Sequence, residues 1–194
     1  MRIITGSKRG IKLISPKTQD SRPILDRVKE SLFSVLYKYD LPEGKTVADV
    51  FSGIGSLGLE ALSRGANFVT FVDKDPKIID ILKKNISKAD FTEKSKVIRA
   101  NAFKIAAPPD FDQPKYDLVF IDPPYPTTRN VSEDSLLAGL LNLLPNQIAP
   151  GAIIVVRTHK AVELLDSYGQ LEIIERRVWG NMAITILGQK TNDK

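Results

Sequence analysis

A buried strand that ends abruptly in two prolines is the feature that most constrains how this chain of 194 residues can fold. Residues 117–121 read Asp-Leu-Val-Phe-Ile, and such an apolar run is typical of a strand covered on both faces of a parallel sheet. Asp122 ends the run, and Pro123 and Pro124 cannot continue a central strand because proline has a fixed φ and no N–H. The sequence therefore predicts a rigid corner at the carboxyl end of a strand, where open α/β sheets bind their ligands.

Apolar runs alternate with helical periodicity along most of the chain. Helices are expected over residues 24–37, 57–63, 76–88 and 136–144, and strands over residues 46–51, 68–72, 96–99, 117–121, 152–156, 172–178 and 183–187. Strands that alternate with helices across short loops predict a doubly wound, mostly parallel α/β sheet, here of seven strands, with right-handed crossovers. The last two strands form a hairpin, which would place one antiparallel strand in the sheet.

The composition excludes several kinds of site and location. The chain has no cysteine, which excludes disulfides, thiolate metal sites and a cysteine nucleophile. His159 is the only histidine, so we expect no metal centre. No apolar run approaches the roughly 18–20 residues that span a bilayer, and the amino terminus lacks the apolar core of a signal peptide. We therefore expect a cytoplasmic protein with no membrane partner.

The positive charge is concentrated near the amino terminus. Six basic residues and one acidic residue lie between Met1 and Arg22, which accounts for the whole formal charge of +5. Turn-forming residues 5–10 lie between two isoleucine-containing segments and predict a β-hairpin or loop pair. A basic segment beside a neutral body is typical of a protein that binds a polyanion, although a solvated tail is the alternative. We divide the chain into a basic arm, residues 1–23, and a main domain, residues 24–190. Nucleic-acid contacts are expected from Arg2, Lys8, Arg9, Lys12, Arg22 and Arg27.

The corner formed by Asp122, Pro123, Pro124 and Tyr125 offers groups that suit an exocyclic amine of a nucleobase. Such a nitrogen is a weak nucleophile because its lone pair is delocalised into the ring. The Asp122 carboxylate and the Pro123 carbonyl could accept its two N–H groups and favour a pyramidal nitrogen with an outward lone pair. Tyr125 could stack on the base, which is worth roughly 1–3 kcal/mol. The alternative is an ordinary proline turn in which Asp122 is a turn former.

A glycine-rich turn follows the first predicted strand. Gly53, Gly55 and Gly58 match the spacing of a dinucleotide-binding fingerprint, and Asp73 ends the next strand, where an acid binds ribose hydroxyls. This pattern makes an NAD-dependent oxidoreductase a serious alternative. Asp49, at the end of the first strand, would repel a pyrophosphate but attract the ammonium group of S-adenosylmethionine. The combination favours S-adenosylmethionine as the cofactor.

Two further groups of residues bear on the assignment. Asn101 and Ala102, after the third strand, offer an amide and a backbone N–H to an adenine edge. Residues 49–66, from Asp-Val-Phe-Ser-Gly to Arg-Gly-Ala, and the Asp-Pro-Pro-Tyr box at 122–125 resemble the bacterial guanine-N2 methyltransferases of 16S ribosomal RNA that form the methyltransferase D type. The resemblance extends to Arg2-Ile-Ile-x-Gly6 with Gly10, to Arg22-Pro23 with residues 27–33, and to Trp179-Gly180, and so covers nearly the whole chain.

The resemblance implies a class I, Rossmann-like methyltransferase domain over residues 24–190. Such an enzyme would transfer a methyl group from S-adenosylmethionine to N2 of one guanine in 16S rRNA, in the small subunit or an assembly intermediate, and we expect it to be a monomer. The implied catalytic residues are Asp122, Pro123, Pro124 and Tyr125, and the implied cofactor-binding residues are Asp49, Phe51, Ser52, Gly53, Gly55, Asp73, Lys74, Asn101, Ala102 and Asp122.

This sequence departs from the family pattern at Asn101 and Arg157, where aspartate and glutamate are usual. The first change would replace a carboxylate contact to the adenine amine with a neutral amide bond. The alternatives that stay open are an adenine-N6 methyltransferase acting on DNA or RNA, an NAD-dependent oxidoreductase and a non-catalytic RNA-binding protein.

Overall fold

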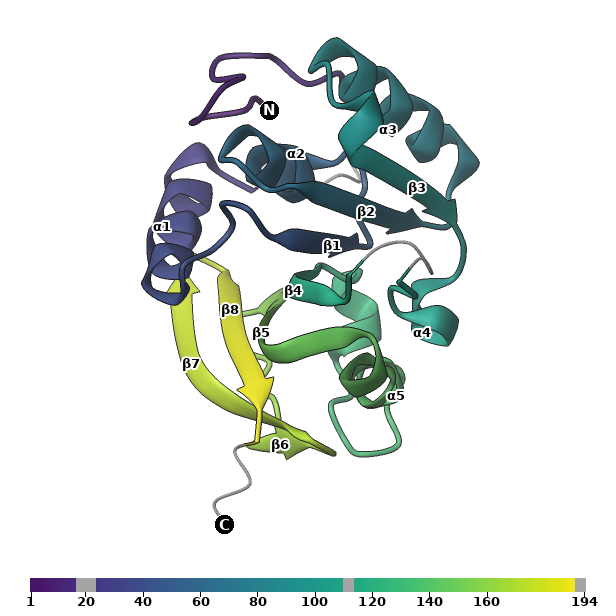
Figure 1. Ribbon diagram of the computed structural model, residues 1–194. Coiled ribbons are helices and arrows are strands. Elements are labelled where there is room, and N and C mark those ends of the chain that lie inside the picture. The colour runs from purple at the N-terminus through teal and green to yellow at the C-terminus, as the bar shows by residue number, and fades with distance from the viewer. Residues whose placement is uncertain (17–23, 110–113, 191–194) are drawn as a thin grey trace.

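An eight-stranded sheet forms the centre of the part of the chain that the computed structural model describes, which is residues 1–16, 24–109 and 114–190 (Figure 1). Its strand order is β3-β2-β1-β4-β5-β8-β7-β6. The strands are β1 (Thr46–Val50), β2 (Phe68–Asp73), β3 (Ser95–Arg99), β4 (Tyr116–Ile121), β5 (Ile148–His159), β6 (Ser167–Tyr168), β7 (Leu171–Trp179) and β8 (Met182–Gln189). The predicted doubly wound, mostly parallel sheet is confirmed.

The strand directions follow the predicted pattern, with one addition. Strands β1 to β5 pair in parallel, whereas β8 is antiparallel to both β5 and β7. The sequence predicted seven strands, and the eighth is β6, which pairs through only two residues at the edge of the sheet. Two residues are too short to show a period of two, so sequence periodicity could not identify this strand.

The two faces of the sheet bury alternate residues of each strand, as pleated geometry requires. In β4, Leu118 and Phe120 pack on the side of α1 (Asp26–Leu36), α2 (Ser56–Ser63) and α3 (Pro76–Lys88). Val119 and Ile121 pack on the opposite side, with α4 (Ala102–Ile105) and α5 (Leu136–Leu143). Short 3₁₀ turns lie at Tyr37–Tyr39, Thr92–Lys94, Tyr125–Thr128 and Leu144–Asn146. No helix in the described ranges combines the length and the apolar character that a membrane crossing needs.

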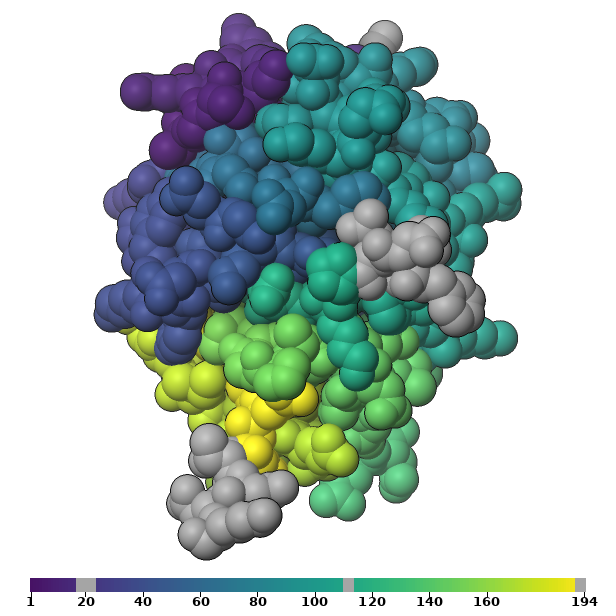
Figure 2. All heavy atoms as spheres, viewed as in Figure 1, coloured from purple at the N-terminus to yellow at the C-terminus, as the bar shows by residue number. Residues whose placement is uncertain are grey.

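The amino-terminal arm, residues 1–16, lies across α2 and reaches α3 (Figures 1 and 2). It folds back on itself through an antiparallel bridge between Arg2 and Lys12. At Gly6, φ is +84°, and an added Cβ would lie 1.8 Å from the backbone oxygen of Ser63, so only glycine allows this close approach. The predicted boundary at residue 23 lies outside the described residues, as does Arg22.

A buried carboxylate at Glu60 of α2 holds the arm in place. Its two oxygens accept the backbone N–H groups of Ile4 at 2.8 Å and Thr5 at 3.0 Å. The same carboxylate pairs with Arg64 at 2.9 Å and with Lys29 of α1 at 3.2 Å, and all three charged side chains are almost completely buried. Burial lowers the pKa of Lys29, and the adjacent Glu60 opposes that change. The ionic contacts therefore join the arm, α1 and α2.

Hydrogen bonds of Asn85, a fully buried residue of α3, also hold the arm in place. Its Oδ1 accepts the backbone N–H of Ile14 at 2.7 Å, and its Nδ2 donates to the carbonyls of Ile14 at 3.0 Å and Ile54 at 3.1 Å. Ile54 belongs to the glycine-rich turn after β1. One amide therefore connects the end of the arm to that turn.

We predict that Glu60→Ala lowers the free energy of unfolding by about 3–5 kcal/mol, because it leaves Lys29 and Arg64 buried with their shared partner removed. Glu30→Ala is the matched control, since Glu30 also pairs with Arg64 but its side chain is half exposed. The control should cost no more than about 1 kcal/mol. Urea unfolding of both variants measures the difference, and equal losses would contradict the structural role given to Glu60.

Candidate active site

A cavity of about 500 Å³ opens at the carboxyl ends of β1, β2, β4 and β5. Strand β1 lies between β2 and β4, so the chain leaves β1 toward one side of the sheet and later returns on the other. This arrangement is the topological switch point at which open α/β sheets bind ligands. The lining residues come from the β1 loop (Asp49, Phe51, Ser52, Gly53, Ile54, Ser56, Leu57), the β2 loop (Asp73, Lys74, Asp75, Ile78), the β4 corner (Asp122, Pro123, Pro124, Tyr125, Pro126), β5 (Arg157) and the amino-terminal region (Met1, Pro16, Ile24).

The loop after β1 is held by backbone contacts of two carboxylates. Asp49 is 2% exposed, and its Oδ2 accepts the backbone N–H of Gly58 at 2.8 Å. A Cβ at Gly58 would lie 2.3 Å from a ring carbon of Phe71, so this glycine lets α2 pack directly on β2. Asp73 of β2 accepts the N–H of Gly53 at 2.9 Å. The two acids therefore shape the loop as well as lining the cavity.

Asp49 has an unusual environment for a carboxyl group. Burial raises its pKa well above the ordinary value, the N–H of Gly58 opposes this rise, and the negative charges of Asp122 and Asp73 add to it. A cationic ligand beside Asp49 would stabilise the ionised carboxylate, because a nearby positive charge favours the charged form.

The Asp-Pro-Pro-Tyr corner leaves the end of β4 as predicted, and a salt bridge fixes its acid. The N–H of Asp122 donates to the carbonyl of Val50 at 3.1 Å, which ties the corner to β1. Arg157 of β5 donates from Nε to Asp122 Oδ1 at 2.7 Å, and its side chain is 8% exposed. This pair was not predicted from the sequence. Its signal is the parallel register that places Ile121 beside Val156, because the next residue on each strand is then Asp122 and Arg157.

The cavity brings together most, but not all, of the residues that the sequence singled out. All four residues of the corner line it, and so do Asp49, Phe51, Ser52, Gly53, Asp73 and Lys74. Gly55, Asn101 and Ala102 are not among its lining residues. The Asn101 Oδ1 accepts the N–H of Phe103 at 3.1 Å and so caps α4. The contribution of Met1, Pro16 and Ile24 was not predicted, since it depends on how the arm folds over α2.

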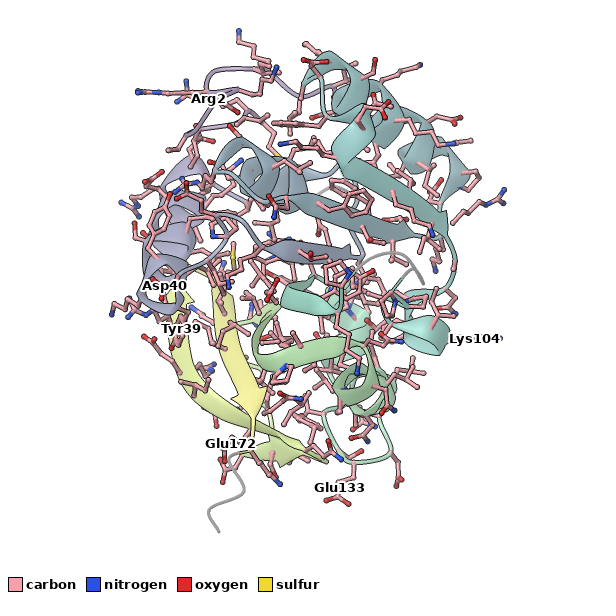
Figure 3. The ribbon with its side chains drawn as sticks, viewed as in Figure 1. Arg2, Tyr39, Asp40, Lys104, Glu133 and Glu172 are labelled. Atoms are coloured by element: carbon pink, nitrogen blue, oxygen red, sulfur yellow. The ribbon has the colours of Figure 1, made fainter. Side chains whose placement is uncertain are left out.

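The predicted nucleic-acid contacts lie in several places. Arg2 is on the outer surface of the arm (Figure 3) and pairs with Asp26 at 2.8 Å. Lys8 pairs with Asp90 at 3.2 Å and lies over the ring of Phe91. Arg9 and Lys12 are exposed on the arm. Arg27 is exposed on α1 and lines a second cavity, which also includes Tyr125.

The residues of the first cavity fit S-adenosylmethionine better than they fit a dinucleotide. The lining contains the carboxyl groups of Asp49, Asp73, Asp75 and Asp122 against the basic groups of Lys74 and Arg157. An excess of acids attracts the positive charges of a sulfonium and an ammonium group, and it repels a pyrophosphate. Asp73 is also placed at the end of β2, where an acid can accept from ribose hydroxyls.

Known proteins resemble this chain over most of its length. The model of the family described as conserved hypothetical protein 95 matches residues 1–188. Ribosomal RNA small subunit methyltransferase D of Haemophilus influenzae is 38% identical over 85% of this chain and 82% of its own length. The protein of the same name from Escherichia coli K12 is 34% identical over 81% of this chain and 74% of its own. The structure of yhhF from Escherichia coli superposes with a TM-score of 0.79 at 29% identity and covers 99% of both chains.

We predict that Asp49→Asn raises the thermal stability of the ligand-free protein at neutral pH. Burial raises the pKa of Asp49 in the folded state, so the stabilising contribution of its neutral form is full below the unfolded pKa of about 4 and is lost as pH rises. Asparagine is neutral at every pH and retains an oxygen for the N–H of Gly58. Each 1 kcal/mol gained should raise Tm by roughly 2–4 °C.

Thermal melts of the parent and of Asp49→Asn across pH 4–8 measure this difference. The two proteins should converge at the acid end of the series and separate as pH rises. A variant that melts below the parent at pH 7–8 would show that the Asp49 carboxylate stabilises the free fold.

Proposed function

Because this chain belongs to the family described as conserved hypothetical protein 95, which its model matches over residues 1–188, we propose that it methylates the N2 amine of a guanine in 16S ribosomal RNA. The coarser activity, methylation of ribosomal RNA with S-adenosylmethionine, follows from its similarity to small subunit methyltransferase D over most of the chain. The choice of guanine N2 rests on the corner at the end of β4.

One observation carries the proposal: the groups suited to an amine and the groups suited to a cationic cofactor line the same cavity. Asp122 and Pro123 contribute to it from β4, and Asp49 and Asp73 contribute from β1 and β2. Neighbouring parallel strands end side by side, so a base amine held at the corner lies next to a ligand held by the other two acids. Holding both reactants in one orientation is the main contribution a protein makes to a direct transfer.

The corner residues prepare the amine for reaction. The carboxylate of Asp122 and the carbonyl of Pro123 accept its N–H groups, which turns the nitrogen lone pair outward. Tyr125 stacks on the ring once the base has left its own stack. Arg157 keeps the Asp122 carboxylate at a fixed orientation, because the 2.7 Å ion pair comes from a rigid strand. S-adenosylmethionine would supply an electrophilic methyl carbon when it is bound. The amine nitrogen would bond to that carbon as the carbon–sulfur bond breaks, the thioether product would leave, and the amine would lose one proton to solvent, with no covalent bond to the protein.

The cofactor site is assigned to residues at the carboxyl ends of three strands, β1, β2 and β3. Asp49 and Asp73 would hold the ammonium group and the ribose diol, and the backbone of Ser52 and Gly53 would lie along the ligand. Asn101 and Ala102 are proposed to reach adenine from the loop after β3, although the cavity lining does not include them. In this assignment the amide of Asn101 gives adenine a neutral contact.

The basic arm is proposed to bind the RNA, in the small subunit or in an assembly intermediate. Its backbone is bonded to Glu60, Ser63 and Asn85, so the exposed side chains of Arg9 and Lys12 are presented from a fixed base. Side chains of this kind neutralise phosphates and supply affinity that does not depend on sequence. We propose that the enzyme acts as a monomer.

Asp122→Ala should reduce kcat for methylation of small subunits by roughly 10²–10³-fold, because the carboxylate acts on the amine in the transition state. The affinity for S-adenosylmethionine, measured by calorimetry, should change little. The substrate is the small subunit isolated from cells that lack this enzyme.

The double variant Asp122→Ala/Arg157→Ala separates a catalytic role of Asp122 from the effect of removing this carboxylate from Arg157. Asp122→Ala alone leaves Arg157 without this carboxylate, and the double variant removes both charges of the pair. If the double variant recovers activity, the loss came from Arg157 and the role of Asp122 given above is incorrect.

Tyr125→Phe should retain nearly the parental kcat, whereas Tyr125→Ala should lose roughly 5–150-fold in kcat/KM, because a phenyl ring stacks and a methyl group does not. Steady-state kinetics on the same subunits tests both variants. An inactive Tyr125→Phe would assign a chemical role to the hydroxyl and refute simple stacking.

A further inference from the structure

A second cavity, of about 510 Å³, adjoins the Asp-Pro-Pro-Tyr corner. Its walls come from the first turns of α1, the end of β5 and the turn between β7 and β8, and they include Arg27, Tyr125, His159, Trp179 and Met182. This volume is in the range of cavities that bind small ligands. The proposed methyl transfer gives this second cavity no role. The cavity is lined in part by the Trp179-Gly180 motif, which the proposed mechanism does not use.

Three aromatic rings, those of Tyr125, His159 and Trp179, line this cavity. The rings of Tyr125 and His159 meet edge to face, with centroids 5.7 Å apart and an angle of 76° between their planes. Trp179 ends β7 and pairs in register with Met182 of β8, so a rigid hairpin presents the indole. Both His159 and Trp179 are only partly buried. Partly exposed aromatic faces are the platforms on which proteins stack unpaired bases, whatever the base.

The position of the cavity indicates which base it could hold. Tyr125 lines both cavities, whereas Asp122 and Pro123 line only the first. A base in the second cavity would therefore be out of reach of the groups that hold the reacting amine. Its sugar and phosphate could still be continuous with those of a base in the first cavity, since the two cavities share a wall.

The charge at the rim of the second cavity also fits a nucleotide. Arg27 is exposed at the start of α1 and lines the cavity beside Leu25 and Val28. A guanidinium at the edge of an aromatic cavity can pair with a phosphate while the base lies inside. His159, whose Nδ1 already accepts the N–H of Ala161 at 3.2 Å, and Asn181 add polar groups to the lining, which suits a base better than an aliphatic occupant.

We propose that this cavity is a binding site for a second, unstacked nucleobase, the neighbour of the target guanine in the RNA strand. The inference rests on the proposed function, because it needs a single RNA strand to enter the first cavity. Trp179 provides the main stacking surface, and Arg27 binds the phosphate between the two nucleotides. Recognition of the methylated position then requires that its neighbour also leaves the stack, whatever that neighbouring base is.

Trp179 gives a direct optical test, since it is the only tryptophan of the chain. The parent protein is titrated with a single-stranded oligoribonucleotide that contains one guanosine, and with the same oligomer made abasic on both sides of that guanosine. We expect saturable quenching of Trp179 fluorescence by the intact oligomer, clearly weaker quenching by the abasic one, and none by S-adenosylmethionine alone. Equal quenching by both oligomers, or quenching by the cofactor alone, would overturn the proposal.

Kinetics on small subunits gives the second test. Trp179→Ala should raise KM for the subunit roughly 5–150-fold and leave kcat near the parental value. In Trp179→Phe, KM should return most of the way to the parental value, because a phenyl ring also stacks. An unchanged KM in Trp179→Ala refutes the site while the parent remains an active methyltransferase. A parent that transfers no methyl group to subunits refutes the proposed function instead, so the two failures can be told apart. Thermal melts show whether each variant is folded.

Discussion

The buried carboxylate of Glu60 is the contact on which the arrangement of the amino-terminal half depends. It accepts from two backbone N–H groups of the arm and pairs with Lys29 and Arg64, so three segments converge on one side chain. Lys29 extends the network to the carbonyl of Arg2 and the hydroxyl of Ser56. Ser56 lines the first cavity at the start of α2. The ionic core thus connects the proposed RNA-binding arm to the wall of the proposed cofactor site.

The pairing of Asp122 with Arg157 gives the active site a second fixed element. An isolated carboxylate at the end of a strand can rotate, whereas a carboxylate held at 2.7 Å by a buried guanidinium has a defined orientation. Arg157 also places a positive charge in a cavity whose other charged walls are mostly acidic. Where the family resemblance leads us to expect glutamate, Arg157 reverses the sign of the charge beside the proposed amine site, so the difference changes the electrostatics of the cavity.

The parts of the fold that sequence could predict are those with a strong local cause. Proline fixed the corner at 122–125, and Pro76 after the capping residue Asp75 fixed the start of α3 at the expected residue. The Glu60 network and the contribution of Met1, Pro16 and Ile24 to the cavity lining were not predicted, because they join segments that are far apart in the sequence and have no periodic signal.

The candidate site likewise has parts that the sequence could predict and parts that it could not. Residues that end the adjacent strands β2, β1 and β4 line one cavity as predicted, whereas Asn101 and Ala102, which follow β3, are not among its lining residues. The ion pair to Arg157 required the register of β5 against β4, and the predicted β5 began four residues later than the real strand, which starts at Ile148. Register, more than the identity of the strands, set the limit of prediction.

The hydrogen bonds that Glu60 and Asn85 make to the arm have a consequence for the order in which the chain folds. Ile4 bonds to a residue 56 positions later, and Ile14 bonds to one 71 positions later. The arm is therefore synthesised before α2 and α3, yet it cannot dock until both helices have been made and packed on β1 and β2. Contacts of such long range form late, because the entropy of closing the loop must be overcome first. A segment that is made before α2 and α3 thus takes its place after them, and the arm residues Met1 and Pro16 join the lining of the cavity after the strand ends have formed the rest of it.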